Sequence, residues 1–325
     1  MRAVIPAAGI GKRLRPHTLN VPKVMINIAG KRLIGHVLDA VASAGVTSVS
    51  IIVGYKGDQV EDYVNRYYGH LRLDYPFQRE RKGLGHAVLQ GLEDKDESVL
   101  ILLGDTVFDV DFQNFVKGDH NAIAVVQVED PRRFGVAEVD DQRRIERLVE
   151  KPENPKSDLA LAGMYFIKDQ RVLKAALEKL IADDVKTRGE YQLTDALQMM
   201  IEEGETIEAV EIKGWYDCGT KESLLESHRF LLDGSQSTDH VKDTIVHQPV
   251  FIHPEAHVSN SVIGPNVTID KNSEVEGAII SESIVGKGSI IRNMILKNSL
   301  IGDNALAESH IRSINVGDYS ELKFD

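Results

Sequence analysis

The spacing of apolar and polar residues changes between about residues 230 and 244. Before that point, short apolar runs alternate with amphipathic stretches, and the stretches 34–44 and 59–67 have helical spacing. The apolar runs predict strands at 2–6, 48–53, 98–103, 122–127, 135–139, 161–166 and 207–211. This alternation predicts an α/β domain with a mostly parallel, Rossmann-like central sheet, whose ligands bind at the carboxyl ends of the strands.

From about Thr244 onward the helical pattern is replaced by a short repeat. Copies of a Ser-aliphatic-aliphatic-Gly unit begin at Ser261, Ser283 and Ser299, and a looser copy occupies 313–317. This pattern resembles the left-handed parallel β-helix of hexapeptide-repeat proteins, with some pentads among the hexads. We therefore predict two domains, 1–235 and 244–325. Aliphatic residues recur every five or six positions and should point inward: Ile252, Val258, Ile263, Ile269, Val275, Ile280, Val285, Ile291, Leu296 and Ile301.

Composition limits the possible partners. A chain of 325 residues with a net charge of −12 carries no broad basic stripe, so we expect no nucleic-acid partner. A single cysteine, Cys218, excludes a disulfide framework and a cysteine-based metal site. The N-terminus resembles a strand rather than a signal peptide, and no apolar run approaches membrane length. We expect a soluble cytoplasmic protein that binds small anionic molecules.

The first turn of the chain has the properties of a phosphate-binding loop. The predicted strand 2–6 leads into Ala8, Gly9 and Gly11, where backbone N–H groups can converge on one anion, and Arg13 and Lys23 add positive charge. Two common phosphate motifs are excluded. A P-loop needs glycine where Pro6 stands and Ser or Thr at position 13, and a dinucleotide fingerprint needs glycine at position 14, which is leucine.

Residues 8–18 and Pro22-Lys23 closely resemble the signature of sugar-phosphate nucleotidyltransferases, A/G-G-x-G-T-R-L-x-P-x-T followed by P-K. The one departure is Lys12, where threonine is usual. Asp105 follows the predicted strand 98–103, and Trp215-Tyr-Asp217 and Glu150-Lys151-Pro152 match further segments of that family. The resemblance implies a glycosyl-phosphate nucleotidyltransferase that joins a sugar 1-phosphate to an NTP and releases pyrophosphate.

The resemblance also implies a role for each candidate residue. Asp105 and Asp217 would bind Mg²⁺, and Arg13, Lys23 and Lys151 would act in catalysis. The nucleotide would contact Ala8, Gly9, Gly11, Gln78, Gly83 and Asp105, with Gln78 and Gly83 reading the base. The sugar phosphate would contact Gly135, Glu150, Lys151, Gly163 and Tyr165, and Glu190 is a further candidate for a sugar contact.

Three questions stay open at this point. Gly83-Leu-Gly-His86 is closer to UDP-glucose pyrophosphorylases, whereas Gly104-Asp-Thr-Val-Phe108 is closer to long glucose-1-phosphate thymidylyltransferases, so both UTP and dTTP are candidates. Glucose 1-phosphate is the expected sugar, with mannose 1-phosphate and GTP as the alternative. A non-catalytic regulatory or assembly homologue is the alternative outside enzymes. Hexapeptide helices also occur in trimeric acyltransferases, so a second, acyl-transfer activity is a further alternative. The short repeat favours a role in assembly, and we expect a homo-oligomer.

Overall fold

The computed structural model describes residues 1–232 and 241–310, and its contacts divide the chain into two units, Met1–Ser227 and His228–Asp325. The looser repeat copy at 313–317 lies outside the described residues. None of the described helices has the length and apolar character that crossing a membrane requires.

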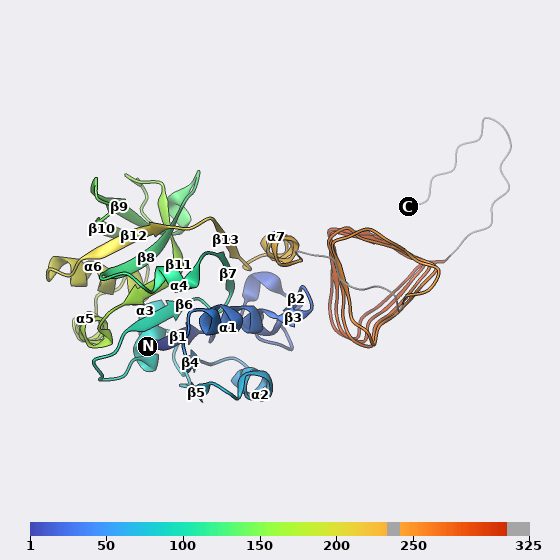
Figure 1. Cartoon of the computed structure of the whole chain (residues 1–325), viewed down its shortest axis with the longest axis horizontal. Coiled ribbons are helices and arrows are strands. Elements are labelled where there is room, and N and C mark those ends of the chain that lie inside the picture. The colour runs from blue at the N-terminus through green and yellow to red at the C-terminus, as the bar shows by residue number, and fades with distance from the viewer. Residues whose placement is uncertain (233–240, 311–325) are drawn as a thin grey trace. The chain divides into compact units, whose positions relative to one another are not determined.

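A nine-stranded sheet forms the centre of the first unit (Figure 1). Its parallel part consists of β5 (Arg72–Asp74), β4 (Ser48–Ile52), β1 (Arg2–Pro6) and β6 (Val99–Leu102), in that order. The long strand β11 (Leu159–Ile167) then runs antiparallel to β6. It also pairs with β8 (Asn121–Gln127) and β9 (Gly135–Val139). The sheet is completed by β12 (Ile207–Glu211), which pairs with β8, and by β10 (Ile145–Glu150), which pairs with β9.

The predicted α/β domain is confirmed, and each of the seven predicted strands is present. The antiparallel direction of β11 is the feature that the apolar pattern did not predict. Strands β5, β7 (Thr106–Asp109), β10 and β13 (Gly214–Asp217) were not predicted, because they are short or carry charged residues. A small hairpin of β2 (Asn27–Ile28) and β3 (Lys31–Arg32) precedes the first helix.

Two apolar layers cover the two faces of the sheet. Alternate residues of β1 contribute to each layer, since Ala3 and Ile5 belong to one and Val4 to the other. A strand buried on both faces reads as a continuous apolar run, which explains why 2–6 was recognisable. The first layer includes α1 (Leu33–Ser43), α2 (Gly57–Tyr68) and α4 (Phe112–Phe115), and the second includes α3 (Leu84–Gly91), α5 (Gln170–Ala182) and α6 (Leu193–Glu202). Helix α7 (Lys221–Leu231) follows them in the chain.

The second unit is a triangular parallel β-helix, seen end-on in Figure 1. Ile252 pairs with Ile269, and Ile269 pairs with Val285, so successive coils contain 17 and 16 residues. Three hexads would need 18, so the predicted pentads account for the difference. The structure fits the predicted left-handed β-helix. Its three sheets are β14 (Ile245–Val246), β17 (Val262–Ile263), β20 (Ile279–Ser281) and β23 (Ile295–Lys297); β15 (Val250–Ile252), β18 (Val267–Ile269), β21 (Ser283–Val285) and β24 (Leu300–Ile301); and β16 (His257–Ser259), β19 (Glu274–Glu276), β22 (Ile290–Arg292) and β25 (Leu306–Glu308).

The predicted inward aliphatics form the core of this β-helix. The first eight of them are buried, and Leu296 and Ile301 pack against them while partly exposed. Asparagines such as Asn266, Asn272 and Asn304 have positive φ between the strands, a conformation that asparagine tolerates better than most residues.

The alternation within β20 gives a direct test of its register. Ile280 is fully buried in the β-helix core, whereas its neighbour Ile279 is 49% exposed. Ile280→Ala should lower the free energy of unfolding of this unit by about 2–5 kcal/mol, because it leaves a cavity. Ile279→Ala should cost less than about 1 kcal/mol. Denaturant unfolding followed by far-UV circular dichroism measures both; a larger cost at Ile279 would show that the register is shifted by one residue.

Candidate nucleotide and sugar-phosphate site

The N-terminal loop is held against Lys23 by close packing. Gly11 has a φ of +69°, and a Cβ at this position would lie 2.8 Å from the Cβ of Lys23 and 3.1 Å from the Cγ2 of Thr18. Any side chain at Gly11 would therefore push the loop away from Lys23. The hydroxyl of Thr18 donates to the carbonyl of Gly11 at 2.8 Å and fixes the turn. Gly9 is exposed and a Cβ there would have open space around it.

Two carboxylates meet through a short antiparallel ladder between β7 and β13. In this ladder Asp217 pairs with Thr106, and the N–H of Cys218 donates to the carbonyl of Asp105 at 3.1 Å. The Nζ of Lys23 lies 2.6 Å from Oδ2 of Asp105 and 3.5 Å from Oδ1 of Asp217. The ladder thus brings together residues that are far apart in the sequence.

The environment of Lys23 keeps its ammonium charged. Its side chain is 8% exposed, and this burial lowers the pKa of Lys23. The negative charges of Asp105 and Asp217 outweigh burial, so the pKa of Lys23 lies above its usual value. The pair of carboxylates is therefore neutralised in part by a buried ammonium that they share.

Arg13 reaches the same point from the N-terminal loop. A Cβ on Gly219 would lie 2.7 Å from Nη2 of Arg13 and 2.6 Å from Oδ2 of Asp217. The guanidinium therefore lies directly against the Gly219 backbone, next to the carboxylate. Arg13 itself remains exposed at the edge of the carboxylate pair.

A cavity of about 310 Å³ extends from Asp105 and Asp217 to Glu150 and Lys151. The carboxylate of Glu150 is 8% exposed; it accepts a hydrogen bond from the Thr194 hydroxyl at 2.7 Å and pairs with Nζ of Lys151 at 2.7 Å. Lys151 has a φ of 45°, a conformation that lysine rarely adopts. Its N–H donates to the carbonyl of Phe134 at 2.9 Å, which holds the chain in this turn.

Three further predicted residues form the wall of this cavity. A Cβ on Gly135 would lie 3.0 Å from the Thr194 hydroxyl, and one on Gly163, where φ is +88°, would lie 2.5 Å from Leu103. Glycine at both positions therefore preserves the shape of the cavity. Tyr165 is buried, and burial raises the pKa of its hydroxyl above the ordinary value. Glu190 also lines the cavity.

The residues predicted to read a base lie together, beside the cavity rather than in its wall. The side-chain amide of Gln78 donates to the carbonyl of Gly83 at 3.4 Å and lies 3.2 Å from Nδ1 of His86. Gly83 has a φ of +118°, and a Cβ there would lie 2.4 Å from the carbonyl oxygen of Tyr191. Only glycine allows the loop to pack this closely on the Tyr191 backbone.

Comparison with known proteins places the chain in a family. A model of the nucleotidyl transferase family matches residues 2–234. The chain belongs to this family. It is 32% identical over 364 residues to the low-salt glycan biosynthesis nucleotidyltransferase Agl11 of Haloferax volcanii, covering 99% of this chain and 100% of that one. It is 32% identical over 359 residues to the glucose-1-phosphate thymidylyltransferase of Streptomyces antibioticus, with 99% of both chains covered.

Two other similarities cover mainly the first unit. The bifunctional protein GlmU of Methanocaldococcus jannaschii is 38% identical over 234 residues, which are 72% of this chain; the match spans only 55% of that relative. A crystal structure of a UDP-glucose pyrophosphorylase bound to UDP-glucose superposes with a TM-score of 0.61 and 25% identity, covering 70% of this chain and 97% of that one.

The nucleotidyltransferase structure adds site residues that the sequence did not single out. Gly219 supports Arg13, and Thr194 orients Glu150. The guanidinium of Arg188 donates to the carbonyl of Lys151 at 3.0 Å. Trp215 lines the cavity, and its ring stacks edge-on against Phe134 with 4.8 Å between the centroids. Trp215 lies two residues before Asp217 on the same strand, so the alternation of β13 could have identified it.

The carboxylate pair fits a divalent cation. The Lys23 ammonium lies near both Asp105 and Asp217, so the two carboxylates face a common point of positive charge. Among the described residues, no group of three or more His, Cys, Asp or Glu side chains could hold a metal ion. Two protein carboxylates are nevertheless what Mg²⁺ commonly takes when phosphate oxygens and water supply its other ligands.

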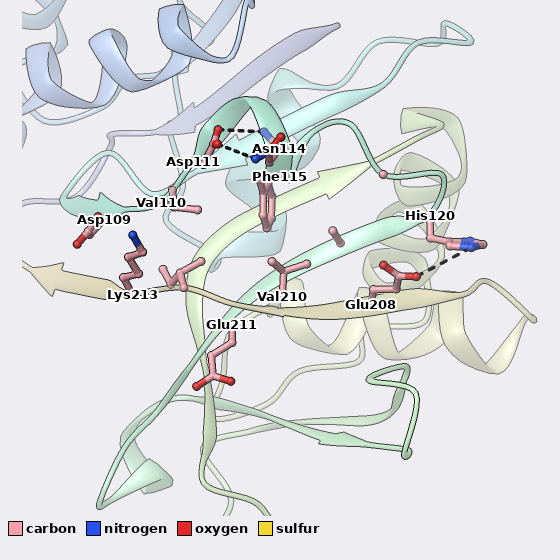
Figure 2. A pocket seen from close by; sticks show the side chains of 13 residues that line it. Asp109, Val110, Asp111, Asn114, Phe115, His120, Glu208, Val210, Glu211 and Lys213 are labelled. Atoms are coloured by element: carbon pink, nitrogen blue, oxygen red, sulfur yellow. Dashed lines mark hydrogen bonds and ion pairs between the residues drawn. The ribbon is translucent and has the colours of Figure 1, made fainter.

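A second cavity, of about 350 Å³, lies between β12 and α4 (Figure 2). Figure 2 shows Phe115 and Val210 within it and carboxylates around it, where Asp111 caps Asn114 and Glu208 faces His120. None of the predicted site residues lines this cavity. The cavity that joins Asp105 to Lys151 is therefore the candidate site.

The contact between Gly219 and Arg13 leads to a test. Gly219→Ala should lower the turnover of this nucleotidyltransferase by about tenfold or more, because the new methyl group displaces the guanidinium and Asp217. The matched control is Gly118→Ala, where a Cβ has its nearest neighbour at 4.0 Å. Steady-state kinetics measure the turnover of both variants, and thermal melting checks that both are folded. Equal activity of the two variants would show that this contact does not position Arg13.

Proposed function

We propose that the chain is a sugar-1-phosphate nucleotidyltransferase, which joins glucose 1-phosphate to dTTP or UTP and releases pyrophosphate. The observation that carries this proposal is the single cavity that contains both the Asp105 and Asp217 pair and the Glu150 and Lys151 pair. A carboxylate pair suits the metal-bound phosphates of a nucleotide, and a lysine beside a buried carboxylate suits a sugar phosphate. The two substrates can therefore meet inside one cavity.

In this mechanism the protein positions charged groups rather than supplying a strong base. The sugar phosphate is already anionic at neutral pH, and its oxygen attacks the α-phosphorus in line with the departing pyrophosphate. Lys151 would hold the attacking phosphate, while Glu150, fixed by Thr194, would accept hydrogen bonds from sugar hydroxyls. Gly135, Gly163 and Tyr165 would shape the space for the sugar ring.

The nucleotide would extend from the carboxylate pair toward the N-terminal loop. Ala8, Gly9 and Gly11 would offer backbone N–H groups to the phosphates, and Arg13 would stabilise the leaving pyrophosphate. Lys23 would neutralise charge at the reacting phosphorus. We propose that the divalent cation is Mg²⁺, which Asp105 and Asp217 would hold and which would stabilise negative charge on phosphate oxygens.

The base would be read by Gln78 and Gly83. The Gln78 amide has both a donor and an acceptor, which suits the edge of a pyrimidine, and it is buried beside the Gly83 carbonyl. The similarity to a glucose-1-phosphate thymidylyltransferase and to a structure of UDP-glucose pyrophosphorylase supports a pyrimidine nucleotide. A non-catalytic role is disfavoured by the intact set of Arg13, Lys23 and Lys151 around the carboxylates.

We further propose that the protein acts in the cytoplasm as a homo-oligomer. The exposed aliphatic residues Ile245, Ile279 and Ile295 share one register position on one face of the β-helix, with the half-buried Val262 between Ile245 and Ile279, and they support an assembly surface. The net charge of −12 and the small-molecule site support the absence of a nucleic-acid partner.

The proposed reaction can be tested by measuring pyrophosphate release with glucose 1-phosphate and Mg²⁺. We expect one of dTTP and UTP to be used at least about a hundredfold better than GTP, CTP and ATP, because a site that hydrogen-bonds one base leaves polar groups unpaired with another. The same nucleotides with mannose 1-phosphate form the comparison series. A preference for mannose 1-phosphate and GTP would replace the proposed substrates, and no release with any sugar phosphate would remove the catalytic proposal.

Arg13→Ala tests the proposed leaving-group contact. We expect kcat to fall by about 10²–10³-fold, because a donor to developing phosphate charge is lost. Arg147→Ala is the control, since Arg147 is an exposed arginine on β10. Both variants should melt at nearly the wild-type temperature. An Arg13→Ala variant with unchanged kcat would exclude the residue from the mechanism.

A further inference from the structure

The ammonium of Lys23 lies in the space that a cation on Asp105 and Asp217 needs. It contacts Oδ2 of Asp105 at 2.6 Å and lies 3.5 Å from Oδ1 of Asp217. A metal ion coordinated by these carboxylates would stand next to an ammonium bound to the same oxygens. Like charges at that separation repel strongly where water is scarce, and the Lys23 side chain is only 8% exposed.

The stem of Lys23 has little freedom to withdraw. Its backbone forms a tight 3₁₀ turn, Lys23–Met25, in which the N–H of Ile26 donates to the Lys23 carbonyl at 3.1 Å. The Gly11 backbone packs so closely on the Cβ and Cγ of Lys23 that an added methyl group would clash. Entry of a metal ion must therefore be accommodated by movement of the ammonium end of Lys23.

We propose that Lys23 competes with the divalent cation for the carboxylate pair. Without nucleotide, its ammonium neutralises Asp105 and Asp217 and weakens binding of the free metal ion. When a nucleotide arrives, its phosphates offer the ammonium another anionic partner, and the carboxylates become available to the metal ion. Nucleotide and cation then bind cooperatively. A nucleotide that draws Lys23 away from the carboxylates strengthens binding of the cation, and a cation that displaces Lys23 from the carboxylates strengthens binding of the nucleotide. This inference rests on the proposed function.

The competition predicts an effect opposite to that of removing an ordinary binding residue. Mn²⁺ alone is titrated into the nucleotide-free full-length chain, and free Mn²⁺ is measured by electron paramagnetic resonance. Lys23→Met should bind Mn²⁺ about tenfold more tightly than the wild type, a change within the usual range of coupling between two ligands. Lys151→Met removes the same charge from the same cavity and should change the affinity by less than about threefold, since that ammonium pairs with Glu150.

The possible results are distinguishable. Equal affinity in Lys23→Met and the wild type, or the same gain in both lysine variants, would overturn the competition. The proposal would also be overturned if the protein bound no Mn²⁺, or if Asp105→Asn left Mn²⁺ binding unchanged. Pyrophosphate release by the wild-type enzyme is measured separately, so the proposed reaction can stand while the role of Lys23 falls.

A measurement on the wild-type chain covers the case in which Lys23→Met does not fold. Acetylation of individual lysines by acetic anhydride is followed by mass spectrometry with and without Mg²⁺, in the absence of nucleotide. Mg²⁺ should increase the labelling rate of Lys23 about threefold or more relative to Lys151, because displacement frees a buried ammonium from its carboxylates. An unchanged or slower rate at Lys23 would overturn the proposal.

Discussion

The closeness of two carboxylates, Asp105 and Asp217, is the constraint on which the site depends. Like charges repel, so the chain holds them together by covalent geometry and hydrogen bonds rather than by mutual attraction. The β7–β13 ladder supplies the hydrogen bonds, and Lys23 supplies the compensating charge. The resulting arrangement attracts a cation, and a cation with free coordination positions attracts phosphates.

The rest of the first unit places two anion-binding groups at suitable positions around that pair. The parallel strands β1 and β6 end close together, since Gly104 donates to the carbonyl of Pro6 at 3.2 Å. The N-terminal loop therefore begins beside the strand end that carries Asp105. The reversed strand β11 contributes Gly163 and Tyr165 to the cavity that leads to Lys151. One sheet thus combines an edge of parallel strands, where we propose that the nucleotide binds, with an edge built around an antiparallel strand, where we propose that the sugar phosphate binds.

The glycines of the site allow close approach rather than flexibility. Gly83 lets its loop contact the Tyr191 backbone, and Gly219 lets Arg13 lie beside Asp217. In both cases the neighbour is a group that a methyl substituent would displace. Such positions are sensitive to small substitutions even though they carry no chemistry of their own, because they determine where charged groups lie.

The sequence by itself determined the features that depend on local patterns. The apolar run at β1, the glycine loop after it and the aliphatic period of the β-helix each follow from neighbouring residues. Only the tertiary structure decided which distant groups touch: Lys23 lies between carboxylates 82 and 194 residues away, and Arg13 lies against Gly219. The reversal of β11 was hidden for the same reason, because strand direction depends on which partners pair, whereas apolar periodicity depends only on which faces are buried.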